Sequence, residues 1–175
     1  LMKNKINIFL ILFFFFLSLT SLKAENLTVY FVDVDKIMSD SNVGKKTIKS
    51  LEKKIKSKFD EFKKQDTALK KKEEEINKQK NILSKEELDK KILEFRLNVQ
   101  KLNQERNKFD REIQQERIVR LNKMLNHLKK ILSKYAADNS ISLILQKTNI
   151  IIGKSSLDIT PQVMDIFNKE IKKID

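Results

Sequence analysis

Apolar residues recur every seven positions along a long polar stretch in the first half of the chain. They stand at Ile48, Ile55, Phe62, Leu69, Ile76 and Leu83. A strict seven-residue repeat keeps one stripe of a helix facing a partner helix as the two supercoil. Residues 44–138 contain no proline, and Gly44 is the only glycine among them. The pattern therefore predicts long helices that pack against each other.

A turn near residues 81–85 is predicted to divide this stretch into two helices. Ser84 and Glu87 have the spacing of a capping box, in which each side chain bonds the backbone amide of the other residue. Apolar residues then resume at steps of three and four, with a gap at Arg106 and a slip near Arg117: Leu88, Ile92, Phe95, Val99, Leu102, Phe109, Ile113, Ile118, Leu121, Leu125, Leu128, Leu132 and Tyr135. Two helices joined by a short turn form an antiparallel hairpin. We call residues 44–138 the arm.

The apolar stripe of the first arm helix is thin. A two-stranded coiled coil needs two apolar positions per seven residues. The second position holds Leu51 and then only polar residues: Lys58, Gln65, Lys72 and Gln79. Burial of one large apolar side chain contributes about 1.5–3 kcal/mol, so few such contacts leave the hairpin weakly held. We expect a soft, bendable arm.

Short segments rich in β-branched and aromatic residues flank the arm. Residues 27–34, 141–145 and 150–152 are predicted strands of one small sheet that closes across the arm. A short helical turn at residues 36–38, capped by Asp35, follows the first strand. A last helix is predicted from Thr160, as cap, to about Lys172, with Pro161 in its first turn. Residues 25–43 and 139–175 together form the head, and the fold class is α+β.

Residues 1–24 have the features of a secretory signal peptide. Lys3 and Lys5 precede an apolar run that is shorter than a membrane-spanning helix, and Ala24 offers a small residue for cleavage. Export would place the mature protein in the periplasm of a Gram-negative type of envelope. An uncleaved membrane anchor is the alternative.

Positive charge is concentrated on the arm. The chain carries a formal net charge of +13. Residues 44–83 hold 14 Lys and Arg against seven Asp and Glu, and residues 85–138 hold 14 against nine. This charge is either a solvated helix surface or a field that attracts acidic chains or anionic lipid headgroups. Nucleic acid is disfavoured because no recognition motif accompanies the charge and the signal peptide directs export.

Residue types needed for most catalytic or metal sites are scarce. His127 is the only histidine, cysteine is absent, and two glycines cannot build a phosphate-binding loop. Asp33 and Asp35 are interpreted as a strand end and a helix cap. The sequence therefore predicts no enzyme activity, no metal site and no cofactor.

Two segments resemble the Skp (OmpH-like) family of periplasmic chaperones. The first is Val29-Tyr30-Phe31-Val32-Asp33 followed by Ser41-Asn42-Val43-Gly44-Lys45-Lys46, similar to that family's strand and its Gly-Lys entry to the arm. The second is Leu143-Ile144-Leu145 followed by Asp158-Ile159-Thr160-Pro161-Gln162-Val163-Met164, similar to the family's Asp-Ile-Thr ending. The resemblance covers nearly the whole mature chain.

The resemblance implies a jellyfish-like homotrimer in which three heads assemble and three arms surround a cavity. It implies an ATP-independent holdase that keeps unfolded outer-membrane β-barrel proteins from aggregating. The positive charge of the arm adds anionic lipid or lipopolysaccharide headgroups as a further expected partner. Residues expected to assemble the head are Val29, Phe31, Leu143, Leu145 and Ile151. Residues expected to contact clients are Phe59, Phe62, Phe95, Phe109, Lys63, Lys64, Lys71 and Lys72; Phe95 and Phe109 also fit the hairpin seam. The alternative is a membrane-anchored coiled-coil protein that tethers an envelope complex.

Overall fold

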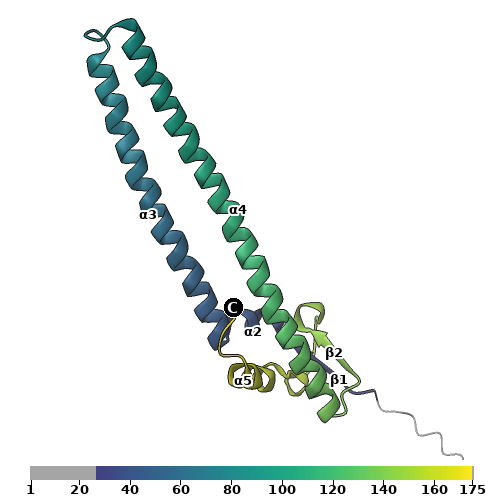
Figure 1. The fold of residues 1–175 in the computed structure, drawn as a ribbon. Coiled ribbons are helices and arrows are strands. Elements are labelled where there is room, and N and C mark those ends of the chain that lie inside the picture. Colours follow the sequence, from purple (N-terminus) through teal and green to yellow (C-terminus); the bar gives the residue numbers. More distant parts are fainter. Residues whose placement is uncertain (1–26, 175) are drawn as a thin grey trace, which may run out of the picture.

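Two long antiparallel helices project from a small head (Figure 1). The computed structural model describes residues 27–174, so the predicted signal peptide lies outside the described residues. Helix α3 (Asn42–Gln79) rises from the head, and helix α4 (Lys85–Asp138) returns to it. The predicted helical hairpin is confirmed.

The tip of the hairpin is closed by the predicted capping box. The Glu87 amide donates to Ser84 Oγ at 3.3 Å, and the Ser84 amide donates to Glu87 Oε2 at 3.1 Å. These bonds satisfy amides that have no partner within the first turn of α4. The hydroxyl and backbone amide of Ser84 both lower the pKa of the Glu87 carboxyl.

The sheet has two parallel strands, and the entire arm forms the connection between them. Strand β1 (Val29–Val32) pairs with β2 (Leu143–Gln146), with Phe31 opposite Leu145. The predicted third strand is wrong, because residues 150–152 lie in the loop between the short 3₁₀ helices Lys147–Asn149 and Ser155–Leu157. The other edge of β1 is taken by a later segment, where the Ile159 amide donates to the Phe31 carbonyl at 3.0 Å.

Two predicted helix caps are also wrong. Strand β1 ends at Val32 because Asp33 caps helix α2 (Val34–Asp40), accepting from the Lys36 amide at 2.9 Å; Asp35 lies inside the first turn. Helix α5 (Thr160–Glu170) contains Thr160 as its first residue. The Thr160 hydroxyl accepts from the Asp33 amide at 2.8 Å instead, which fastens the start of α5 to the end of β1.

The hydrophobic core of the head includes the last turns of α4. Met124, Leu128 and Ile131 are buried against residues from β1, α2, α3 and α5: Val32, Ile37, Val43, Val163 and Phe167. The core of the head therefore includes residues of the predicted arm. The sequence pattern placed Leu125 and Leu132 in the stripe, whereas the structure buries their neighbours Met124 and Ile131 and leaves Leu125 and Leu132 half-buried.

The corner between α2 and α3 requires a glycine. Ser41 is fully buried and caps α3 by accepting from the Gly44 amide at 3.1 Å. A side-chain carbon on Gly44 would overlap the Met38 carbonyl oxygen at the end of α2. This close approach lets the chain turn sharply from the head into the arm.

We predict that Gly44→Ala destabilises the chain by about 1–3 kcal/mol, because the added methyl group overpacks this corner. The exposed neighbour supplies a control: Lys45→Ala should change the free energy of unfolding by less than about 0.5 kcal/mol. Urea denaturation followed by circular dichroism measures both. Equal midpoints for Gly44→Ala and the parent chain would contradict the steric role of this glycine.

Candidate functional site

The arm is held by a narrow seam of apolar side chains. Phe62 of α3 is 7% exposed and packs edge-on against Phe109 of α4, with ring centroids 6.0 Å apart. The Lys58 ammonium and the Arg106 guanidinium lie 5.2 Å and 5.5 Å from the Phe62 centroid, where a ring face attracts a cation. Leu102 is also buried along this seam.

Ion pairs between the two helices add to this seam. Lys54 bonds Glu116 at 2.6 Å, Lys72 bonds Glu94 at 2.9 Å, and Arg106 pairs with Asp66. The Lys54 ammonium, together with Arg120, holds the pKa of Glu116 below its usual value. Lys72 does the same for Glu94. All three pairs are partly exposed, so each contributes little individually, but together they fix the register of the helices.

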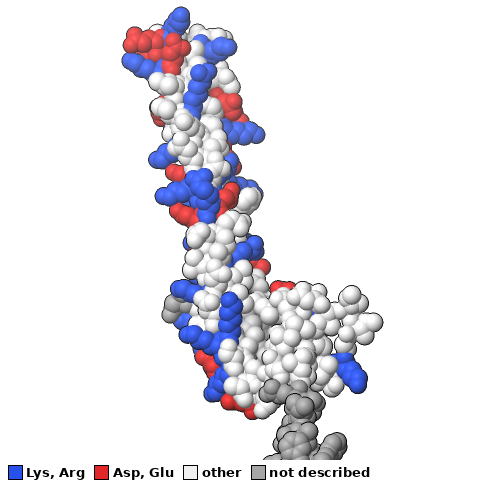
Figure 2. Space-filling view, turned by 90° about the vertical axis from the view of Figure 1, so that its right-hand side faces the viewer, with Lys and Arg blue, Asp and Glu red and all other residues white. Residues whose placement is uncertain are grey.

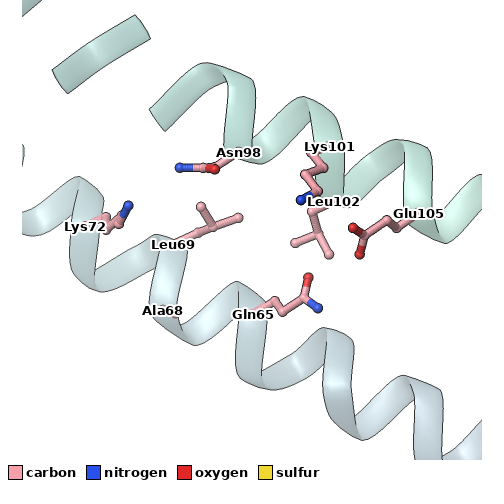
Figure 3. A pocket seen from close by; sticks show the side chains of 8 residues that line it. All are labelled: Gln65, Ala68, Leu69, Lys72, Asn98, Lys101, Leu102 and Glu105. Carbon is pink, nitrogen blue, oxygen red and sulfur yellow. The ribbon is translucent and has the colours of Figure 1, made fainter. Parts of the chain in front are cut away.

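A polar hollow separates the helices farther toward the tip (Figure 3). It measures about 310 Å³, and Gln65, Lys72, Asn98, Lys101 and Glu105 line it beside Leu69 and Leu102. The polar positions noted in the sequence, Gln65 and Lys72, thus reduce the apolar contact on either side of Leu69. This arrangement supports the expectation of a weakly packed arm.

One flank of the arm near the head carries an apolar depression, which we call the base groove. Two hollows, of about 330 and 480 Å³, share Ile55. Their apolar lining consists of Met38, Ile48, Leu51, Ile55, Phe59, Phe62, Phe109, Leu121 and Met124. Ile48, Ile55 and Leu121 are each more than two-fifths exposed. The sequence pattern placed these three residues in the seam. The mostly polar second position of the seven-residue repeat was the signal in the sequence that the opposite helix would not cover this stripe completely.

The predicted client-contact residues divide into two groups. Phe59 is 67% exposed at the base groove, and Lys63, Lys64, Lys71 and Lys72 are exposed. Phe62 is buried in the seam, which removes most of its surface from any partner. Phe95 and Phe109 are half-buried, consistent with the seam position that their spacing also allowed.

The predicted head-assembly residues also divide. Phe31 is only 7% exposed and Val29 is half-buried, so the chain itself covers much of both. Leu143, Leu145 and Ile151 are exposed, and so is Ile152, which the sequence analysis did not select. Ile151 and Ile152 are 98% and 91% exposed. Figure 2 looks onto the side of the head that carries β2, and few charged side chains appear on it.

Residues 27–174 contain neither a membrane-spanning helix nor a candidate metal site. No helix of this part of the chain has the length and apolar character to cross a membrane. The same residues contain no group of three or more His, Asp or Glu side chains placed to hold a metal ion.

The comparisons with known proteins agree with this architecture. The family model described as "Outer membrane protein (OmpH-like)" matches residues 28–167, which is most of the chain. The chain belongs to the OmpH-like family. A similar fold occurs in a crystal structure from Caulobacter crescentus CB15 whose name describes an OmpH-like outer membrane chaperone. The two chains superpose with a TM-score of 0.79 and are 16% identical in sequence. The superposition covers 84% of this chain and 87% of the Caulobacter chain. No curated protein sequence matches this chain.

Membership in the OmpH-like family supports a chaperone role. The predicted resemblance to the OmpH-like family is thereby confirmed. The matched residues include both the arm and the head, so either can contribute surface to a chaperone role. The arm offers apolar surface in the base groove and a net positive charge along its helices, while the head offers the exposed apolar residues of β2 and the following loop.

We predict a pH-dependent contribution from the ion pair of Glu116. Because the folded state lowers the pKa of this carboxyl, its stabilisation is complete above the ordinary glutamate pKa and is lost as pH falls through the lowered value. Glu116→Gln should therefore lower Tm at about pH 7 and have little effect at about pH 3. Glu112→Gln is the control, since its ion pair with Lys108 lies within one helix at 3.9 Å. A Glu116→Gln effect that is equal at both pH values would contradict this role.

Proposed function

We propose that this OmpH-like protein is an ATP-independent periplasmic holdase that binds unfolded outer-membrane β-barrel proteins and prevents their aggregation. The observation that carries the proposal is the apolar surface left open on both the arm and the head of a chain in this family. Large exposed apolar patches mark interaction sites in soluble proteins. The signal peptide expected at residues 1–24 would deliver the protein to the compartment that such clients cross.

The arm is the proposed client-binding element. Phe59 and the half-exposed isoleucines of the base groove supply apolar contact, and the excess of lysine and arginine attracts acidic segments. A weakly packed hairpin can adjust to many sequences, which suits a protein that binds chains without a fixed structure. The same positive charge makes anionic lipid headgroups a further proposed partner.

The head is the proposed assembly element of a homotrimer. A sheet of only two strands is marginal alone, and β2 has Leu143 and Leu145 exposed. Ile151 and Ile152 extend this surface from the adjoining loop. Joining three heads through this face would cover the apolar residues and leave three arms around a common cavity.

We predict that Leu145→Asp and Ile151→Asp each convert the trimer to a monomer with helical content near that of the parent chain. Both residues are exposed in the single chain, so a charge there is costly only when another copy covers it. Ile82→Asp is the matched control, since Ile82 is 82% exposed at the far tip of the arm. Light scattering measures the mass. Trimers from both head variants would contradict this assembly face.

We predict that salt slows capture of a client far more than it speeds release. Charge attraction over open solvent is screened within about 8 Å at physiological salt and about 3 Å at 1 M, whereas apolar contact persists. Stopped-flow fluorescence with a urea-denatured outer-membrane β-barrel protein separates the two rates. Release that accelerates as steeply as capture slows would mean that charge alone holds the complex. Failure of the parent chain to suppress aggregation of this client would contradict the holdase function itself.

A further inference from the structure

We propose that the base groove binds short extended segments of the client in which apolar side chains alternate with polar ones. This inference rests on the proposed holdase function and specifies where on the arm, and through which kind of segment, the client is held. The groove runs along α3 from Ile48 to Phe59, with Leu121 of α4 on its opposite wall.

The dimensions of the groove suit an extended segment. Eleven helical residues separate Ile48 from Phe59, a length of about 16 Å. About five extended residues span this length, and their same-face side chains are spaced by roughly 6.7 Å. The two hollows, of about 330 and 480 Å³, lie in succession along this line and meet at Ile55. Each has the size of a site that receives a small ligand, and therefore an aromatic or branched side chain.

The charges around the groove favour a neutral segment. Four acidic and three basic residues border the two hollows, and one pair of them, Asp66 and Arg106, is joined in an ion pair. The hollow on the other flank of the arm differs, because helical spacing places mostly polar side chains around it. Three lysines and two glutamates line it, and Lys58 is paired there with Glu61 at 2.6 Å. The apolar and the charged surfaces of the lower arm are thus separated. An uncharged apolar segment fits the first, and charged parts of a client fit the second.

A second copy of the chain fits the base groove less well. Stable interfaces between folded proteins use roughly 20–30 residues on each side. The groove offers only a few exposed apolar residues between charged ones, and its two hollows receive single side chains rather than a flat surface. The segments of an unfolded β-barrel protein supply such side chains at every second position.

The test uses the full-length protein and a urea-denatured eight-stranded outer-membrane β-barrel protein as the client. In one variant, Ile48→Gln is combined with Phe59→Gln, two partly exposed positions where a polar residue has little effect on folding. The matched control combines Leu93→Gln with Leu97→Gln, which are 59% and 55% exposed on α4 outside the groove. The groove variant should release the client about tenfold faster than the parent chain, and the control should release it at the parent rate. Equal release rates for the two variants would overturn the proposal.

A photoreactive phenylalanine analogue at position 59, compared with one at position 97, identifies the occupant directly. We expect client adducts at position 59, and mass spectrometry should map them to client segments of alternating apolar and polar residues. Adducts to a second copy of the chain, or adducts spread equally over acidic client segments, would overturn the proposal while leaving the holdase function in place. A parent chain that neither binds the client nor prevents its aggregation would overturn both.

Discussion

The packing of the last turns of α4 into the head is the interaction on which the rest of the structure depends. Leu128 is fully buried there, and it joins segments that are far apart in the sequence: β1 and α2 before the arm, α5 after it. The arm itself has too few apolar contacts to be well ordered without this anchor, because most helical stability in proteins comes from tertiary packing. Gly44 sets the direction in which α3 leaves the same core, since only glycine allows the close approach to Met38. A rigid base and a weakly held arm are thus two consequences of one distribution of apolar residues.

The thin seam leaves surface available for function. Polar side chains between the helices, such as Gln65 and Asn98, remove apolar contact that a tightly packed coiled coil would have. Ion pairs such as that of Lys54 with Glu116 maintain the register without closing the arm into a rigid rod. Ile48 and Ile55, which a second apolar position in every seven residues would have helped to cover, are instead half-exposed beside Phe59. The weakness of the hairpin and its capacity to bind a partner therefore have the same origin.

Sequence reasoning succeeded where a local pattern determines the structure and failed where tertiary contacts choose between patterns. The hairpin and its Ser84 cap follow from periodicity and from a spacing of three residues, and both are present. The strand at residues 150–152 was wrong because the segment at Asp158 and Ile159 occupies the free edge of β1, a competition that composition cannot reveal. Met124 and Leu125 are adjacent apolar residues, and only the position of the head core decides that Met124 is the one buried. The burial of Phe62, by contrast, agrees with its place in the seven-residue repeat, and Phe59, which lies outside that repeat, is exposed.

Hydrogen exchange of the full-length protein, measured with and without a bound unfolded β-barrel protein, tests the central claim that the arm holds the client and the head does not. The account predicts slower amide exchange on binding in α3 around residues 48–66 and in α4 around residues 106–121. It predicts no change in β1, β2 or α5, whose amides exchange slowly in both states because they surround the core of the head. Protection confined to the head, with an arm that exchanges equally in the free and bound states, would contradict the account.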